Sequence, residues 1–223
     1  MVIVDVQEAA RQLGVSPRRV RKILADKLVP GVRIGRAWAV EQRHLDRFKD
    51  HRAPIGRPWS PSSAWAALAA ADGHDSALAP VDRSRARHRL SGRGLLGVVD
   101  RLAARAQRQD FYGHPSVLRR LASEPNLILS GVSAAADHGV DVLASDFLEA
   151  YVPLSQAQDI VRRYALDADA ERPNIVLRIV EDSVWPFASG DRVAARAVVA
   201  VDLLESEDDR SRRAGSALAR RPQ

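Results

Sequence analysis

The fold of the N-terminal region is decided by QEAARQLGVSPRRVRKIL, residues 7–24. Its first part predicts an amphipathic helix, because two alanines and a leucine recur at the spacing of one helix face. Gly14 permits a sharp turn after that helix. Ser16 and Pro17 are typical of the cap and first position of a second helix, where a proline loses no hydrogen bond. The stretch therefore predicts two short helices joined by a tight turn.

The second of these helices is strongly basic. Val20, Ile23 and Leu24 share one face, so we expect them in the core and the basic residues outside. An arginine near the start of such a helix can form a bidentate pair with guanine, worth roughly 1–3 kcal/mol of base discrimination. The alternative is a solvated basic face. The turn, the cap and the density of positive charge together favour contact with DNA.

A predicted hairpin, VRIGRAWAV at residues 32–40, follows the basic helix. A basic helix beside a basic hairpin suits duplex DNA, where the helix enters the major groove and the hairpin follows the backbone or minor groove. Trp38 is expected to pack in the hairpin core rather than to stack on a sugar. The residues predicted to contact DNA are Ser16, Pro17, Arg18, Arg19, Arg21, Lys22, Arg33 and Arg36.

Several short motifs fall in the order of a known family. They are EAA at residues 8–10, LGVS at 13–16, Pro30, RIGR at 33–36 and VEQRHLDRF at 40–48. With these motifs, residues 5–49 resemble the excisionase-like, MerR-related winged helix-turn-helix family. The chain has Lys27 where that family often has glycine. The resemblance implies that the second helix enters the major groove and that Arg33 and Arg36 reach the DNA backbone.

Charge is distributed unevenly along the 223 residues. Residues 1–60 carry 13 Lys/Arg and 6 Asp/Glu, and residues 81–120 carry 10 and 3. Residues 121–223 carry 11 Lys/Arg and 17 Asp/Glu. The front half is therefore suited to a polyanion and the back half is not. Because nearly all the basic residues are arginine, we attribute that choice first to coding bias.

We expect three parts in the chain: residues 1–50, 51–94 and 95–223. The first is the winged helix-turn-helix domain, and the second is a linker with one helix, which begins at Ser60-Pro61. Five arginines follow within residues 81–94. This basic segment is either an exposed arm or strand that adds DNA contacts, or a solvated connection whose arginines pair with the acidic C-terminal half.

The third part is predicted to be a small mixed α/β domain for self-association or partner binding. Its expected helices cover residues 95–109, 115–122, 155–164 and 208–221, and its strands are at 127–129, 150–153 and 174–180. Residues 197–204 suit either a strand or a helix. The whole chain is therefore expected to be α+β, with a winged helix-turn-helix, a helical linker region and this domain.

Residues 57–220 carry a second resemblance to a known family, with less specific motifs than those of residues 5–49. It rests on residues 57–65, 129–135, 151–152, 174–178, 201–204, 209–210 and Ala214. These segments resemble the C-terminal part of AbiEi-like antitoxins from the abortive-infection type IV toxin–antitoxin group. That resemblance implies autorepression of an operon and neutralisation of a nucleotidyltransferase-like toxin.

We find no pattern of an enzyme. The chain lacks a phosphate-binding glycine loop, and it has no cysteine and no pair of histidines at metal-ligand spacing. An acidic patch at Asp202, Glu205 and residues 207–209 could bind magnesium in a nuclease. We expect these carboxylates instead to cap or solvate the last helix, or to pair with arginines at 210–213. We therefore expect no catalysis, no cofactor and no metal.

A DNA-binding module of this size offers about five phosphate contacts, so a fourfold rise in salt weakens its binding roughly 500-fold. This favours a homodimer, a cooperative array on DNA, a second DNA-binding segment or a protein partner. No apolar run approaches a membrane span, and no signal peptide is recognisable at the N-terminus. We expect a cytoplasmic, nucleoid-associated protein.

The sequence thus favours a sequence-specific repressor that binds double-stranded operator DNA, as the antitoxin of its own operon. The alternative is an excisionase-like factor that bends DNA for a recombinase, although excisionases are usually little longer than the N-terminal module. A third interpretation, a protein-binding adaptor with a relic helix-turn-helix, conflicts with the arginine-rich second helix.

Overall fold

The computed structural model describes residues 3–13, 16–25, 29–35, 37–45, 58–142 and 146–221. The chain divides into two compact units, Met1–Ala53 and Pro54–Gln223, called here the first and the second unit. Each unit has hydrophobic core clusters of its own. Residues 51–94 were expected to be a linker with one helix and a basic segment, and in the structure residues 58–94 are part of the second unit.

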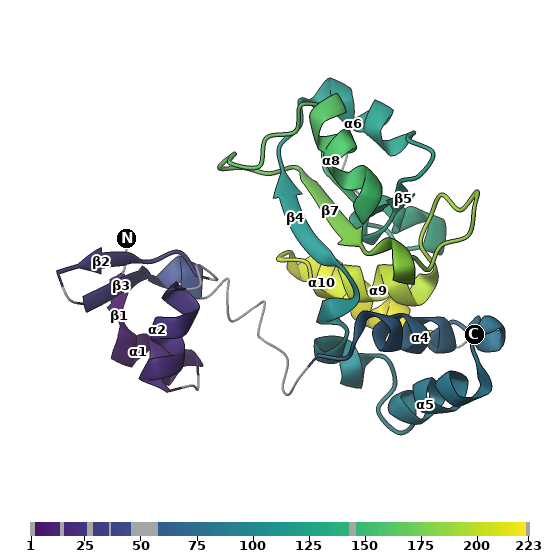
Figure 1. Cartoon of the computed structure of the whole chain (residues 1–223), viewed down its shortest axis with the longest axis horizontal. Coiled ribbons are helices and arrows are strands. Elements are labelled where there is room, and N and C mark those ends of the chain that lie inside the picture. Colours follow the sequence, from purple (N-terminus) through teal and green to yellow (C-terminus); the bar gives the residue numbers. More distant parts are fainter. Residues whose placement is uncertain are drawn as a thin grey trace. The chain divides into compact units, whose positions relative to one another are not determined.

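The first unit joins two helices to a three-stranded antiparallel sheet in the order β1-β3-β2 (Figure 1). Its elements are β1 (Ile3–Asp5), α1 (Val6–Leu13), α2 (Pro17–Ala25), β2 (Val32–Ile34) and β3 (Ala37–Glu41). Residues 42–45 form one further helical turn. The buried core comprises Val4, Ala9, Ala10, Val20, Ile23, Leu24, Val29, Val40 and Leu45.

The local patterns of the sequence explain where these helices begin. The Asp5 carboxylate accepts a hydrogen bond from the Glu8 backbone N–H at 2.8 Å and so caps the start of α1. Pro17 is the first residue of α2, and the Ser16 carbonyl accepts from the Val20 N–H at 3.1 Å. The predicted turn residue Gly14 lies outside the described residues.

The β2–β3 hairpin forms the wing of the first unit. Its register pairs Ile34 with Ala37, and Gly35 lies in the turn that follows Ile34. Gly35 has a φ of +61°, a conformation that glycine adopts at little cost. Trp38 packs partly buried against the core of the unit, as the sequence predicts. The wing therefore belongs to the same packed body as the two helices.

The second unit is built on a four-stranded mixed sheet in the order β4-β7-β6-β5, with β6 and β7 parallel. The strands are β4 (Gln107–Phe111), β5 (Ile128–Leu129), β6 (Leu148–Pro153) and β7 (Ile175–Val180). The helices are α4 (Pro61–Ala71), α5 (Pro80–Leu90), α6 (Pro115–Ala122), α7 (Gly131–Ala134), α8 (Leu154–Arg163), α9 (Arg196–Leu204) and α10 (Asp209–Ala219). Short 3-10 helices are η1 (Asp75–Ala77), η2 (Leu96–Arg101), η3 (Ala103–Arg105), η4 (Ala136–His138) and η5 (Asp182–Val184).

Alternate residues of the sheet enter two separate cores. One core packs α6 and α8 against Phe111, Leu148 and Leu177. The other packs α4 and α9 against Tyr151 and Val180. Figure 1 shows α6 and α8 on one side of β4 and β7, with α9, α10 and α4 on the other. Both faces of the sheet are therefore covered, and the expected α+β class is confirmed.

Most predicted elements of this unit are confirmed, but the helix expected over residues 95–109 is wrong. The segment forms η2 and η3 and then the edge strand β4. β4 is polar, QRQDF, and its five residues pair with β7 from Gln107↔Ile179 to Phe111↔Ile175. Pairing with a strand nearly seventy residues away overrides the local helical pattern, because a polar edge strand carries little periodic signal of its own.

The basic segment at residues 81–94 is neither a strand nor an irregular connection, because most of it is helix α5. The ambiguous segment at 197–204 is also helical, and Ala197 to Leu203 are all buried in α9. A helix that is apolar on all sides must be enclosed by other elements. Among the residues that the structure describes, no helix is both long and apolar enough to cross a membrane.

Candidate nucleic-acid interface and buried ion network

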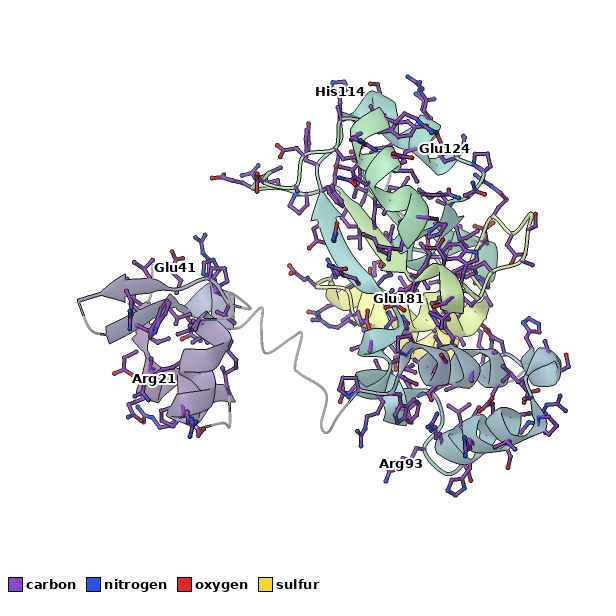
Figure 2. All side chains as sticks on the ribbon, in the orientation of Figure 1. Arg21, Glu41, Arg93, His114, Glu124 and Glu181 are labelled. Atoms are coloured by element: carbon purple, nitrogen blue, oxygen red, sulfur yellow. The ribbon has the colours of Figure 1, made fainter. Side chains whose placement is uncertain are left out.

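Helix α2 presents a cationic face to solvent. Arg18 and Arg21 are exposed and lie three residues apart, hence on the same side of the helix (Figure 2). The helix contains no acidic residue that could neutralise them. Arg19 and Lys22 belong to the same helix, but their side chains lie outside the described part of the structure. The opposite face, with Val20, is buried in the core.

The N-terminal end of α2 adds further positive charge to this cationic face. Ser16 is exposed and Pro17 is half-buried directly at this end. The backbone N–H groups of a helix N-terminus attract anions, and no acidic side chain lies in the first turn of α2. A phosphate group at this end would therefore meet favourable charge without a competing carboxylate.

The wing supplies a third cationic position. Arg33 is exposed on β2, and its guanidinium lies over the ring of its cross-strand partner Trp38, 5.5 Å from the ring centroid. Such a cation–π contact restrains the arginine while leaving its N–H donors toward solvent. Arg36, the other predicted wing contact, lies outside the described residues.

Not every exposed arginine of the first unit is equally available to bind an anion. Arg11 forms an ion pair with Glu8, and Arg43 forms one with Glu41. By contrast, Arg18, Arg21 and Arg33 make no ion pair with any residue that the structure describes. Within the described part of the first unit, the arginines that make no ion pair are thus those on α2 and on the wing.

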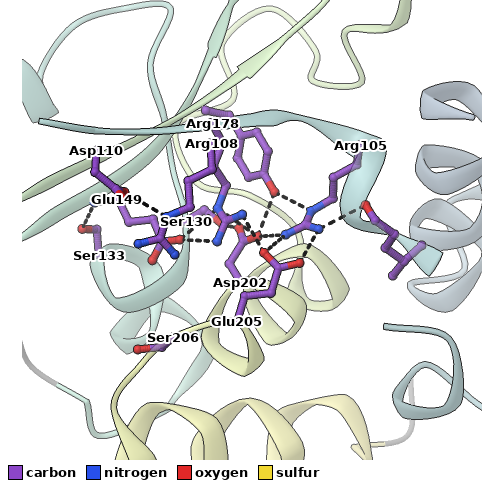
Figure 3. A network of polar contacts seen from close by, with 12 residues as sticks. Arg105, Arg108, Asp110, Ser130, Ser133, Glu149, Arg178, Asp202, Glu205 and Ser206 are labelled. Carbon is purple, nitrogen blue, oxygen red and sulfur yellow. Dashed lines mark hydrogen bonds and ion pairs between the residues drawn. The ribbon is translucent and has the colours of Figure 1, made fainter. Parts of the chain in front are cut away.

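The second unit buries a network of charged side chains between its sheet and α9 (Figure 3). Arg105 and Arg178 are both almost fully buried, at 1% and 3% exposure. Their carboxylate partners are Glu149, Asp202 and Glu205. The expectation that Asp202 and Glu205 serve the last helix is therefore wrong. They pair with arginines from η3 and β7, which no local spacing could indicate.

The geometry of the network is dense. Arg105 contacts both Glu205 oxygens at 2.7 Å and Asp202 at 2.5 Å, and it donates to the Tyr151 hydroxyl at 3.0 Å. Arg178 contacts Glu149 at 2.7 Å and Glu205 at 2.7 Å. Among the described residues, no buried side-chain nitrogen or oxygen lacks a hydrogen-bond partner. The cost of burying these charges is thereby largely offset.

The network also shifts the pKa of its members. Burial raises the pKa of Glu149, against the opposing effect of Arg178. Burial raises the pKa of Tyr151 as well. For Glu205, burial is outweighed by Arg105 and Arg178, which lower its pKa to about 2. Glu205 is thus a carboxylate that the fold holds ionised.

Glycine is required beside this network. Gly131 begins α7 with a φ of +50°, and a Cβ atom there would lie 1.9 Å from the Glu149 carboxylate. The remaining acidic residues behave as expected from the sequence. The Asp208 carboxylate caps α10 by accepting from the Ser211 N–H at 2.7 Å, and Asp209 pairs with Arg212. The network therefore joins β6, β7, η3 and α9 into one body.

Comparisons with known proteins agree with the geometry of the first unit. Residues 3–53 match the protein family described as "Helix-turn-helix domain". A relative described as "Probable plasmid-partitioning protein ParA" from Thermus thermophilus is 43% identical over 47 residues, which cover 21% of this chain and 15% of the relative. No solved structure matches the chain. The family match ends at residue 53, so the antitoxin-like resemblance of residues 57–220 gains no support from it. The capped helices, the wing and this match together identify residues 3–53 as a helix-turn-helix domain, a fold that implies DNA as its partner.

Proposed function

We propose that the protein is a sequence-specific DNA-binding transcriptional regulator that represses its own promoter. The observation that carries this proposal is the exposed pair Arg18 and Arg21 on α2, together with Arg33 on the wing, none of which makes an ion pair with a described residue. A helix with arginines on its outer face can recognise guanine in the major groove, and a wing arginine can contact the backbone. Specific recognition of one operator is what a repressor requires.

The test is a binding titration of the full chain with its own promoter DNA and with scrambled DNA, using Arg18→Ala/Arg21→Ala. Each bidentate arginine–guanine pair is worth about 1–3 kcal/mol, so the double variant should lose at least about tenfold in selectivity. The matched control is Arg119→Ala/Arg162→Ala, which removes two exposed arginines from α6 and α8 of the second unit.

Two results would contradict the repressor proposal. One is equal affinity of the wild type for both DNAs, and the other is an unchanged selectivity in Arg18→Ala/Arg21→Ala. Strong bending of DNA without promoter selectivity would instead support the excisionase-like alternative. Bending is measured by the mobility of circularly permuted DNA fragments in the same titration.

The finer part of the proposal is that the repressor is an antitoxin whose second unit binds a nucleotidyltransferase-like toxin. Its support is the resemblance of residues 57–220 to AbiEi-like antitoxins and the presence of a second packed unit in addition to the DNA-binding one. The test is co-expression with the product of the adjacent gene. Restored growth and co-purification of the two proteins support it, and continued growth arrest contradicts it without affecting the repressor proposal.

A further inference from the structure

Helix α5 and the turn after it are rich in arginine. Residues 80–93 contain five arginines and one aspartate. The sequence left open whether these arginines meet DNA or pair with the acidic C-terminal half. The structure separates them into two groups with different surroundings.

Three of the arginines are engaged with nearby groups. Arg83 donates to the backbone carbonyls of Asp75, Ser76 and Leu78 at 3.0, 2.8 and 3.2 Å. Arg87 donates to both carboxylate oxygens of Asp75 at 2.6 and 3.0 Å. Arg89 lies over the Trp59 ring, 4.9 Å from its centroid. These partners belong to residues 59–78, so pairing with the acidic C-terminal half, one of the two alternatives, does not describe these three arginines.

The other two arginines face solvent. The Arg85 side chain is 68% exposed, and Asp82, its acidic neighbour at 3.8 Å, is itself 58% exposed. A surface pair of that kind contributes little and is readily exchanged for another partner. Arg93 is exposed and makes no ion pair with any residue in the described ranges. Figure 2 shows the Arg93 side chain directed away from the ribbon.

Further donors lie on the same side of α5. Ser84 and His88 are exposed, and His88 follows Arg85 by three residues. We call Ser84, Arg85, His88 and Arg93 the α5 surface. Figure 1 shows α5 beside α4, at the end of the second unit away from α6 and α8, and each of the four residues of the α5 surface is exposed.

We propose that the α5 surface is a second DNA contact, which binds the phosphate backbone of the duplex that the first unit recognises. Guanidinium and hydroxyl groups are the usual donors to phosphate oxygens, and such contacts strengthen binding without selecting a sequence. The inference rests on the proposed function. A second contact would also strengthen the binding of the chain to DNA at cellular salt, where the about five phosphate contacts of a small module hold it only weakly. Since both surfaces belong to one chain, the second contact is intramolecular and multiplies the affinity of the first.

The experiment measures the affinity of the full chain for promoter and scrambled DNA across a salt series. The test variant is Arg85→Ala/Arg93→Ala. Each phosphate contact adds about 0.9 to the slope of log affinity against log salt, so losing two contacts should reduce the slope by about 1.8. The loss should be equal on both DNAs. Arg85→Lys/Arg93→Lys, which keeps the charges, should retain most of the slope.

The control is again Arg119→Ala/Arg162→Ala, which is closely matched. Arg162 forms an i,i+3 ion pair with Asp159 as Arg85 does with Asp82, and Arg119 makes no ion pair with a described residue, like Arg93. The net charge change is identical. A slope reduced in the α5 variant but not in the control supports the second contact.

Three outcomes would overturn the inference. An unchanged slope in Arg85→Ala/Arg93→Ala removes the α5 surface from the DNA interface. Equal reductions in the variant and the control assign the effect to net charge alone. Weaker binding of an acidic protein partner with unchanged DNA binding assigns the surface to that partner. If the wild type binds promoter selectively, Arg18→Ala/Arg21→Ala loses that selectivity and Arg85→Ala/Arg93→Ala leaves the salt slope unchanged, the proposed function stands and the second contact falls. If the wild type binds no DNA, both fall.

Discussion

At the scale of single residues, Glu205 is the carboxylate through which the buried network meets solvent, with 25% of its side chain exposed. Its pKa lies at about 2 in the folded protein, against 4.5 without the fold. An acid whose folded pKa is depressed stabilises the fold above pH 4.5, and this stabilisation is lost as the pH falls toward 2. The shift corresponds to at most about 3 kcal/mol.

We therefore predict that Glu205→Gln lowers the free energy of unfolding of the second unit at pH 7, and that its deficit relative to the wild type shrinks between pH 5 and pH 2. Glu149 acts with the opposite sign, because its raised pKa favours the fold as the pH falls. Comparing variant with wild type in denaturant unfolding at each pH isolates Glu205. Glu181→Gln, at an exposed glutamate, is the control. If the deficit in the free energy of unfolding of Glu205→Gln stays constant with pH, the lowered pKa of Glu205 is refuted.

At the scale of elements, one buried carboxylate helps to hold α5 in place. Asp75 is buried at 3% exposure, and Arg87 lowers its pKa through a bidentate hydrogen bond. Asp75→Asn keeps the shape but removes the charge that balances Arg87. We expect the amides of α5 to exchange with solvent faster in this variant, while the amides of β6 and β7 are unchanged. Asp82→Asn on the exposed face is the control, and equal protection of α5 in both variants would contradict this role.

Whether the type of an element could be predicted from the sequence depended on how local the interactions that stabilise it are. Helices α6 and α8 carry an apolar stripe, and the residues of these stripes are the ones that reach the core. In β4, by contrast, only Phe111 is buried, and its strand form depends on hydrogen bonding to β7. A segment whose state is set by a distant partner carries no periodic pattern from which that state can be predicted.

At the scale of the whole molecule, the two units have separate cores. Ile23 is buried in the first unit and Leu177 in the second. Truncating either to alanine should cost about 2–5 kcal/mol, because a buried aliphatic group is replaced by a cavity. We predict that Ile23→Ala lowers hydrogen-exchange protection in residues 3–45 alone, and that Leu177→Ala does so in residues 58–221 alone. Loss of protection in both units after either substitution would show that they unfold together.

The sequence by itself determined the fold of the first unit and which of its arginines are exposed on α2 and the wing. Asp5 capping, Pro17 at the start of α2 and the buried face at Val20 are all interactions within a few residues, so spacing alone reveals them. The exposure of Arg18, Arg21 and Arg33 follows from the same periodicity, whereas their contacts with DNA remain predictions.

Only the tertiary structure decided the role of the charged residues in the second unit. Arg105 meets Asp202 and Glu205 from 97 and 100 residues away, and in the sequence those two acids look like part of a solvated patch. The arginines of α5 likewise divide into engaged and exposed groups through contacts with residues 59–78. The sequence alone does not show whether a charged residue is buried or solvated. Which of the two it becomes depends on the distant partners that the folded chain brings to it.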